Sequence, residues 1–334
     1  MRSIFRAALV IILAGAIMYF ISFALGTRGG FIYFDSGKLK AVTMDNHSAE
    51  MIDVEPFSNL VIDVRSIDVE LIEADDYKIE YQLPINGSLQ WELSNGALNI
   101  SEQSRAPLIF SFGFINSYVK VYYPADADIE LADISIRSGN IKVNKLTADS
   151  IHLKTTSGTI RANVLNYSNA KVETDSGSIH FSGYGNNAVL VITDKSGDVE
   201  ADISGCINVD VNVTSGKLIC SGETVGNATI KLLTGSGNII SDISSWQTLT
   251  ASTKSGRIAI TGKPTGTTSA EANSGDIVIK ILGSKEDFSY SISTRSGTIR
   301  IDGNKTEHYA DSLGGSVSIE ISTRSGNIHL DFVE

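Results

Sequence analysis

The sequence predicts an all-β protein: a single-stranded β-solenoid of about ten coils, each of about 19–20 residues, with a β-rich N-terminal cap and one N-terminal transmembrane helix before it. Three observations predict this fold. The phrase Ser-Gly-x-[Ile/Val/Leu] recurs ten times, apolar and polar residues alternate after each copy, and a long run near the N-terminus carries no charge.

The recurring phrase sets the period of the chain. Its first residues are Ser138, Ser157, Ser176, Ser196, Ser215, Ser236, Ser255, Ser274, Ser296 and Ser325. Successive serines lie 19, 19, 20, 19, 21, 19, 19, 22 and 29 residues apart. A period near 20 residues is typical of stacked repeats.

Each repeat predicts two strands joined at a corner. Two and four residues after each glycine stand mainly apolar residues, such as Ile141 and Val143, with polar residues such as Lys142 between them. This alternation indicates a half-buried strand. Another apolar position lies five residues before the glycine, and threonine recurs three residues before it. The glycine suits a corner that needs positive φ or a close backbone approach.

A single repeat has only one side to bury, so we expect the repeats to stack and share a core. Ten coils at about 4.8 Å each would form a rod on the order of 50 Å long. A β-sandwich with regularly spaced hairpins is the alternative. The solenoid is favoured because hairpins do not require the same residue type at the same register in every repeat.

The N-terminal segment predicts a membrane anchor. Residues 7–26 form a run of about 20 residues without a charge, enough for a helix of roughly 30 Å that crosses a bilayer. Arg2 and Arg6 precede the run and favour a cytoplasmic N-terminus. We interpret residues 1–26 as an uncleaved signal anchor, with a cleaved signal peptide or a buried helix as alternatives. We therefore expect a single-pass protein of the cell membrane whose β domain is extracytoplasmic.

Three further segments complete the expected organisation. Residues 27–49 are interpreted as a stem or linker, residues 50–130 as the β-rich cap, and residues 131–334 as the solenoid. The cap is expected to cover unpaired backbone groups of the first coil. Aromatic residues supply bulk there: Trp91, Tyr81, Tyr118 and Tyr122.

The ionisable residues predict no metal, cofactor or catalytic site. The net charge of −11 argues against a nucleic-acid partner. Among the five histidines, His180 and His329 share a register but are expected seven coils apart, too far to share a metal. Six acidic residues on two successive coils could offer oxygen ligands to calcium, although a solvated face is the favoured interpretation. These are Glu173, Asp175, Asp194, Asp198, Glu200 and Asp202, of which Asp194 takes the position usually held by threonine.

Two other groups of side chains have an ordinary interpretation beside a functional one. Cys206 and Cys220 could form a disulfide in an exported protein, but they are expected on different faces of adjacent coils and are interpreted as buried free thiols. Cations near the last coils, including Arg295 and Arg324, could attract an anionic polymer. Ordinary alternation of charges on a solvated face is the favoured interpretation.

Residues 118–143, YVKVYYPADADIELADISIRSGNIKV, resemble the signature of the bacterial putative-adhesin family of unknown function. The strand, the turn at Pro124 and the ten Ser-Gly corners carry the resemblance, which covers roughly residues 55–334. It implies a β-solenoid on a membrane-tethered envelope protein, with adhesion or envelope-stress roles, and it brings no catalytic residues. The last step of 29 residues, into which residues 302–315 intrude, departs from the pattern.

We therefore expect a non-enzymatic scaffold of the cell envelope that presents a repetitive surface to a wall polymer, a protein partner or a second copy of itself. Because the chain ends in a strand at 326–334, its last edge could pair end to end with another chain. Two alternatives stay open. One is an envelope-stress module that acts through a membrane partner, and the other is a polysaccharide-processing β-helix enzyme, which would need a groove built from long loops.

Overall fold

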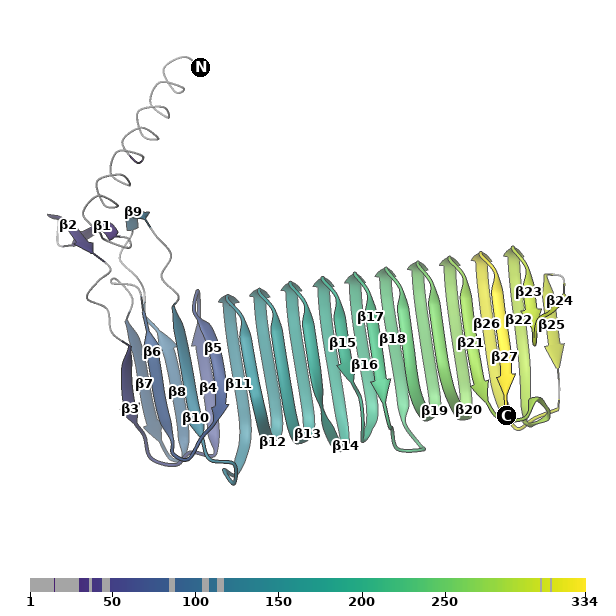
Figure 1. The fold of residues 1–334 in the computed structure, drawn as a ribbon, viewed down its shortest axis with the longest axis horizontal. Helices are drawn as coiled ribbons and strands as arrows, with labels where there is room; N and C mark the ends of the chain where they lie inside the picture. Colours follow the sequence, from purple (N-terminus) through teal and green to yellow (C-terminus); the bar gives the residue numbers. More distant parts are fainter. Residues whose placement is uncertain are drawn as a thin grey trace, which may run out of the picture.

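The repeats stack into a long rod of parallel β coils (Figure 1). The computed structural model describes residue 15 and residues 30–35, 38–43, 49–83, 88–103, 108–112, 117–306, 308–312 and 314–334. The predicted anchor at residues 7–26 therefore lies outside the described residues, apart from Gly15. In the described part of the chain, no helix has the length and apolar character that crossing a membrane requires.

Each regular coil is one long strand, and the Ser-Gly-x corner separates it from the next. The strands begin at the aliphatic residue after the corner and mostly end at the serine of the next phrase, so the return segments expected to connect two strands are themselves largely strand. The first strands of the solenoid are β11 (Ile129–Ser138), β12 (Ile141–Ser157), β13 (Ile160–Ser176), β14 (Ile179–Ser196), β15 (Val199–Asp202), β16 (Cys206–Ser215), β17 (Leu218–Gly222) and β18 (Thr229–Ser236). The later ones are β19 (Ile239–Ser255), β20 (Ile258–Ser274), β21 (Ile277–Leu282), β22 (Phe288–Ser296), β23 (Ile299–Ile301), β24 (Asn304–Thr306), β25 (Tyr309–Ser312), β26 (Val317–Ser325) and β27 (Ile328–Val333).

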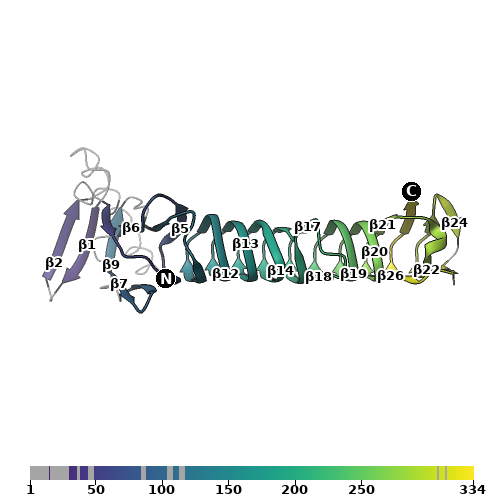
Figure 2. The same ribbon diagram turned by 90° about the horizontal axis from the view of Figure 1, so that it is seen from below.

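The aliphatic positions form continuous columns inside the rod. Ile160 lies beside Ile179, and Ile179 beside Val199, in parallel register, and all three side chains are at most 1% exposed. The predicted shared core is therefore confirmed. The solenoid also buries large aromatic residues, among them Trp246 and Tyr167. Figure 2 shows the chain winding from coil to coil along one axis.

The Ser-Gly corners stack so closely that only glycine fits. The ten corner glycines have φ between +143° and +156°, a region that L side chains rarely adopt. A Cβ added to nine of them would lie 1.7–2.1 Å from the carbonyl oxygen of the glycine one coil away. The repeated glycine therefore answers a steric requirement between coils as well as the need for a turn.

Five of the six recurring threonines fasten a corner to its neighbour. Their side chains are buried, and their hydroxyls donate to the glycine carbonyl of the adjacent coil at 3.0–3.4 Å. The threonines with this contact are Thr155, Thr174, Thr253, Thr294 and Thr323. The contact satisfies a hydroxyl that faces the interior, where an unpaired polar group is costly.

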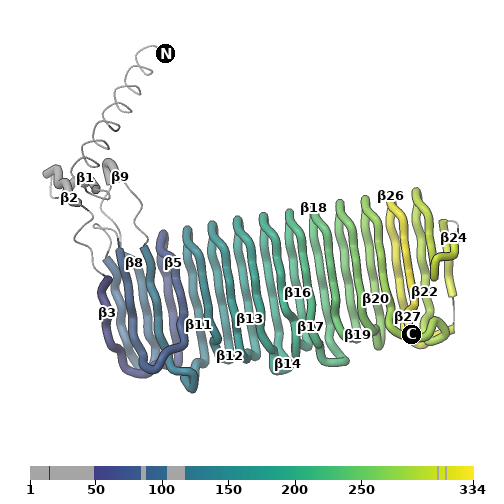
Figure 3. The backbone as a smooth tube through the Cα atoms, in the orientation of Figure 1, coloured from purple at the N-terminus to yellow at the C-terminus, as the bar shows by residue number. Residues whose placement is uncertain are grey.

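The spatial order of the last coils differs from their sequence order. β26 pairs with β20 on one side and with β22 on the other, and β27 likewise lies between β21 and β23. The C-terminal coil is thus inserted one place before the end of the rod, as the yellow strands in Figure 3 show. The outermost coil is β22–β23, preceded by a short 3₁₀ helix, η2 (Lys285–Asp287), and covered by the antiparallel strands β24 and β25.

This insertion corrects the expected position of the C-terminus. The open edge expected at residues 326–334 is wrong for Ile328–Leu330, which pair with β21 on one side and β23 on the other, whereas Asp331–Val333 pair with β21 alone. It also accounts for the 29-residue step, whose extra residues form the two covering strands and the return into the stack. End-to-end self-association stays a prediction.

The cap continues the solenoid. Its strands are β3 (Glu50–Asp53), β4 (Asn59–Val64), β5 (Asp68–Glu73), β6 (Lys78–Gln82), β7 (Leu89–Ser94), β8 (Ala97–Glu102) and β10 (Tyr118–Tyr123). β4 pairs with β11 and β5 with β12, both in parallel, so they supply a coil ahead of the first Ser-Gly phrase. These strands therefore lie against the first coils of the solenoid.

Part of the segment expected to be a stem also forms strands. β1 (Gly30–Asp35) and β2 (Lys38–Thr43) pair antiparallel, and β1 also pairs with β9 (Leu108–Phe112) from the cap. These three strands form a separate small sheet. The cap therefore shares a sheet with residues that were expected to form a linker.

Candidate functional site

A groove on the outer face of the solenoid is the best candidate for a binding site. It runs across β12 to β17, encloses about 450 Å³, and is lined by side chains from five successive coils. Its floor is formed by the inward-facing residues Val143, Ala162, Phe181 and Ala201, which lie in one register. The repeat brings these residues into one groove, because each position of a coil lies beside the same position of the next coil.

Two columns of polar side chains line the groove. The first is Lys142, Arg161, His180 and Glu200, each beside the next in the parallel register. The second consists of Asn144, Asn163, Ser182, Asp202 and Ser221, two residues further along each coil. The columns offer a hydrogen-bonding group at every coil, about 4.8 Å apart.

The charges of the groove change sign along the rod. Lys142 Nζ contacts Glu70 Oε1 at 2.5 Å, and His180 Nε2 lies 3.9 Å from Glu200 Oε2. Arg161 forms no ion pair with any residue that the structure describes. Its exposed guanidinium is therefore free for a ligand, and Arg presents a planar fork of donors that suits carboxylates and phosphates.

The two acidic residues at one end of the groove, Glu200 and Asp202, differ in their hydrogen bonds and exposure. Asp202 Oδ1 accepts hydrogen bonds from Ser204 N at 3.0 Å and Ser204 Oγ at 2.6 Å, so it holds a turn. The Glu200 side chain is 63% exposed. A general acid for glycoside cleavage needs a carboxyl shielded from water, and neither residue provides one.

The remaining predicted acidic residues do not converge on a cation. Glu173 accepts from Lys171 and His152, Asp175 pairs with Lys195 at 2.7 Å, Asp198 accepts from Lys217 N, and Asp194 is buried. Among the described residues, no three His, Cys, Asp or Glu side chains are grouped so that they could hold a metal ion.

The histidines are also separate. Because the C-terminal coil is inserted, His180 and His329 lie six coils apart rather than the expected seven, about 29 Å at the strand spacing. The sequence pattern did not indicate that His152 contacts acidic residues of both adjacent coils. Its Nδ1 lies 3.1 Å from Asp133 and its Nε2 3.1 Å from Glu173. It therefore bridges three coils, and only knowledge of the stacking register could have revealed this.

Both cysteines are free and buried, as expected. Burial raises the pKa of Cys206 to about 11, although a hydrogen bond with Tyr167 partly opposes this effect. The Tyr167 hydroxyl and Cys206 Sγ lie 3.1 Å apart. Thiols in this setting are unreactive, since the thiolate is the nucleophile.

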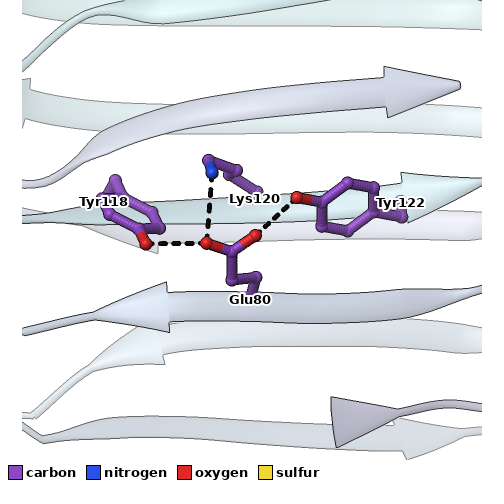
Figure 4. A network of polar contacts seen from close by, with 4 residues as sticks. All are labelled: Glu80, Tyr118, Lys120 and Tyr122. Carbon is purple, nitrogen blue, oxygen red and sulfur yellow. Dashed lines mark hydrogen bonds and ion pairs between the residues drawn. The ribbon is translucent and has the colours of Figure 1, made fainter. Parts of the chain in front are cut away.

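A second polar cluster, which the sequence pattern did not indicate, lies on the cap (Figure 4). The Glu80 carboxylate on β6 accepts hydrogen bonds from Tyr118 at 2.7 Å, Tyr122 at 2.5 Å and Lys120 at 3.1 Å, all on β10. Tyr118 and Tyr122 thus point to the polar face of β10. Its core positions are Val119, Val121 and Tyr123. Trp91, on β7, is 38% exposed.

The electrostatics of this cluster suit a structural brace. Burial raises the pKa of Glu80, but the hydrogen bonds from Tyr122, Tyr118 and Lys120 together outweigh it, so the pKa of Glu80 lies below its ordinary value. The hydrogen bond to Glu80, with burial, raises the pKa of Tyr118 to about 12. A carboxyl that holds its charge and a phenol that holds its proton are poor acid–base catalysts near neutral pH.

Comparisons with known proteins agree with the architecture. The family model described as Toastrack DUF4097 matches residues 57–239 and 189–331, which together span most of the chain. No curated protein matches the sequence.

Solved structures resemble the chain weakly. A protein named as a putative adhesin from Parabacteroides distasonis is 14% identical, with a TM-score of 0.44 over 85% of this chain and 97% of that one. A protein from the same organism, named as a putative lipid binding protein, is 14% identical, with a TM-score of 0.37 over 87% and 98%. A putative adhesin from Bacteroides fragilis is 13% identical, with a TM-score of 0.32 over 86% and 98%.

Proposed function

Because the chain belongs to the Toastrack DUF4097 family, whose repeats form the solenoid described above, we propose that it is a non-enzymatic scaffold that binds an acidic polysaccharide of the cell envelope. The observation that supports this function is the groove across β12 to β17. In this proposal residues 7–26 anchor the chain in the cell membrane, and the solenoid extends on the extracytoplasmic side.

The chemistry of the groove suits a polysaccharide. Amide, hydroxyl, imidazole and guanidinium groups line it, and such groups exchange hydrogen bonds with sugar hydroxyls. Successive coils repeat these groups at about 4.8 Å, a spacing close to the length of one sugar unit in an extended chain. A polymer that lies along the rod would therefore meet a polar side chain at each unit.

The unpaired guanidinium of Arg161 favours an acidic polysaccharide over a neutral one. Arg161 is exposed and forms no ion pair with the described residues, and it lies between Lys142 and His180 in one column. Carboxylate or phosphate groups on the polymer would bind here with charge-assisted hydrogen bonds. The non-enzymatic part of the proposal is supported by the acidic residues of the groove, which are exposed or committed to a turn.

A matched pair of arginines allows a direct test. Arg161 and Arg300 both stand three residues after a corner glycine, but Arg300 lies in the outermost coil and outside the groove. We expect the full-length chain to bind a uronate-containing polysaccharide more tightly than a neutral one. Arg161→Ala is expected to weaken binding about tenfold, and Arg300→Ala to leave it unchanged.

Three outcomes would contradict this proposal. Equal losses in the two variants would show that any surface cation serves. Absence of binding to every polysaccharide tested would exclude the function itself. Release of sugar fragments during the assay would exclude a purely non-enzymatic role. Membrane anchoring is tested separately by cell fractionation, in which a chain recovered without detergent would contradict the anchor.

A further inference from the structure

Asp194 interrupts the ladder of buried threonines that fastens the corners together. It stands three residues before Gly197, as Thr174 does before Gly177, and it lies beside Thr174 on one side and Val213 on the other. Its side chain is 1% exposed. A carboxyl group therefore occupies a position where six other coils hold threonine, a neutral hydrogen-bond donor.

The geometry of the corner places one carboxyl oxygen where the threonine hydroxyl would be. A Cβ built on Gly197 would lie 1.7 Å from the carbonyl oxygen of Gly177 and 2.9 Å from Asp194 Oδ2. The same atom built on Gly158 would lie 1.9 Å from the Gly139 oxygen and 3.3 Å from Thr155 Oγ1. In that coil the hydroxyl donates to the glycine carbonyl at 3.0 Å. Asp194 Oδ2 is therefore positioned against the Gly177 carbonyl.

The two carboxyl oxygens differ in their partners. Oδ1 accepts a hydrogen bond from Ser196 N at 2.9 Å, whereas Oδ2 is buried with no hydrogen-bond partner among the described residues. An ionised Oδ2 would face another acceptor in an environment without water, which is costly. A protonated Oδ2 would instead donate to that acceptor and complete the ladder.

We propose that Asp194 is a neutral carboxylic acid in the folded protein at acidic pH, that its Oδ2 proton is donated to the Gly177 carbonyl, and that loss of this proton as the pH rises loosens the corner between β14 and its neighbouring coils. The corner is thereby a pH-sensitive latch in the solenoid. This inference is independent of the polysaccharide function.

The charged groups around the corner favour the neutral form. β13 contributes Asp175, which pairs with Lys195 of β14 at 2.7 Å. The turn after β14 contributes Asp198, and β16 presents Val213 directly opposite. Burial raises the pKa of Asp194 to about 6. The hydrogen bond from Ser196 N opposes this rise, whereas the charges of Asp198 and Asp175 add to it.

The sign of the effect follows from the raised pKa. In the unfolded chain Asp194 titrates near its ordinary value of 3.8. Its proton therefore stabilises the folded corner fully below that value, and this stabilisation is lost as the pH rises through about 6. Because each coil contacts only its neighbours, the loss acts locally. The corner should be tightest in acid and open more often at neutral and alkaline pH.

Hydrogen exchange of the full-length chain tests the latch between pH 5 and 8, after correction for intrinsic exchange rates. The reporting amides are Ser196 N, which donates to Asp194, and Gly177 N, which donates to the Ser196 carbonyl. We expect their opening constants to rise on the order of tenfold across this range. The equivalent amide Gly237 N donates to the Ser255 carbonyl of a coil fastened by Thr253, and its opening constant should not change.

Variants separate the proton from the shape of the side chain. In Asp194→Asn the side-chain amide keeps an acceptor for Ser196 N and supplies a permanent donor to the Gly177 carbonyl. The Ser196 and Gly177 amides should therefore stay protected from exchange at every pH. In Asp194→Thr the opening constants of these amides should not vary with pH, as in the coils fastened by threonine. Asp149→Asn, at an exposed position on β12, should keep the wild-type pH dependence.

A direct titration decides the proposal even if a variant fails to fold. The ¹³C chemical shift of the Asp194 carboxyl should titrate well above the ordinary value of 3.8. A midpoint at or below that value would overturn the proposal, and so would corner amides whose corrected opening constants do not vary with pH. Retention of the full pH dependence in Asp194→Asn would also overturn it.

Discussion

Substitution of a corner glycine tests whether close stacking of the coils, rather than turn geometry alone, requires glycine. In Gly237→Ala the new Cβ would lie 1.8 Å from the carbonyl oxygen of Gly216, which is backbone and cannot rotate away. The residue would also be held at φ +152°. A strained φ costs on the order of 1–3 kcal/mol, and separation of the two coils would add the loss of backbone hydrogen bonds at about 1 kcal/mol each. We expect a total loss of about 3–5 kcal/mol in the free energy of unfolding.

Two other glycines isolate the contributions. Gly303 has φ +77°, but nothing lies within 4 Å of the position that an added Cβ would take, so Gly303→Ala should show the cost of φ alone. Gly226 has neither a positive φ nor a neighbour within 4 Å of that position, and Gly226→Ala should change stability by less than about 0.5 kcal/mol. Urea unfolding of the full-length chain would measure all three. Equal losses in Gly237→Ala and Gly303→Ala would refute the stacking argument.

Three further predictions concern buried polar groups. Trp246 Nε1 donates to Thr268 Oγ1 at 2.9 Å in the interior, so Thr268→Val should cost about 1–3 kcal/mol, measured by urea unfolding; a smaller loss would mean that the indole finds another partner. The Glu80 carboxylate stabilises the cap at pH values above its unfolded pKa, and this contribution is lost as the pH falls through its lowered folded pKa. Tyr122→Phe should move the pKa of Glu80 toward its ordinary value in an NMR titration. An unchanged pKa would contradict the role of Glu80 as a structural brace. Cys206 should react with a thiol reagent only after unfolding, because it is buried and its pKa is raised; rapid labelling of the native chain would contradict this.

The sequence pattern was sufficient for the solenoid because the repeat is local and periodic. Ile160 and Ile179 could be assigned to a core from the alternation of apolar and polar residues alone, since alternation implies burial on one face. The unusual position of Asp194 was also visible, because it takes the place of a threonine in the alignment of repeats. The polar groove was not visible, because its residues become neighbours only through the stacking register.

The cap was harder to predict than the coils. Tyr118 and Tyr122 have aromatic rings that favour burial in general, but they stand at alternate positions from Val119 and Val121 and therefore face the opposite side of β10. Glu80, on an antiparallel neighbour, then supplies the acceptor. Without the pairing of β6 with β10, the sequence could not show that Tyr118 and Tyr122 share one carboxylate.

The inserted C-terminal coil explains why periodicity cannot fix the order of coils. Every coil presents the same corner and the same backbone ladder, so β26 matches β20 as well as β22 does. The connections between the strands set the order of the coils. Along the chain, the outermost coil β22–β23 comes first and the covering strands β24 and β25 follow. The strands β26 and β27 then lie between that coil and β20–β21. This order covers the distal end with two short antiparallel strands and removes the C-terminus from the edge, which reduces the risk of uncontrolled edge pairing. Connectivity therefore gives the outermost coil of the described rod an antiparallel cover instead of a further parallel coil.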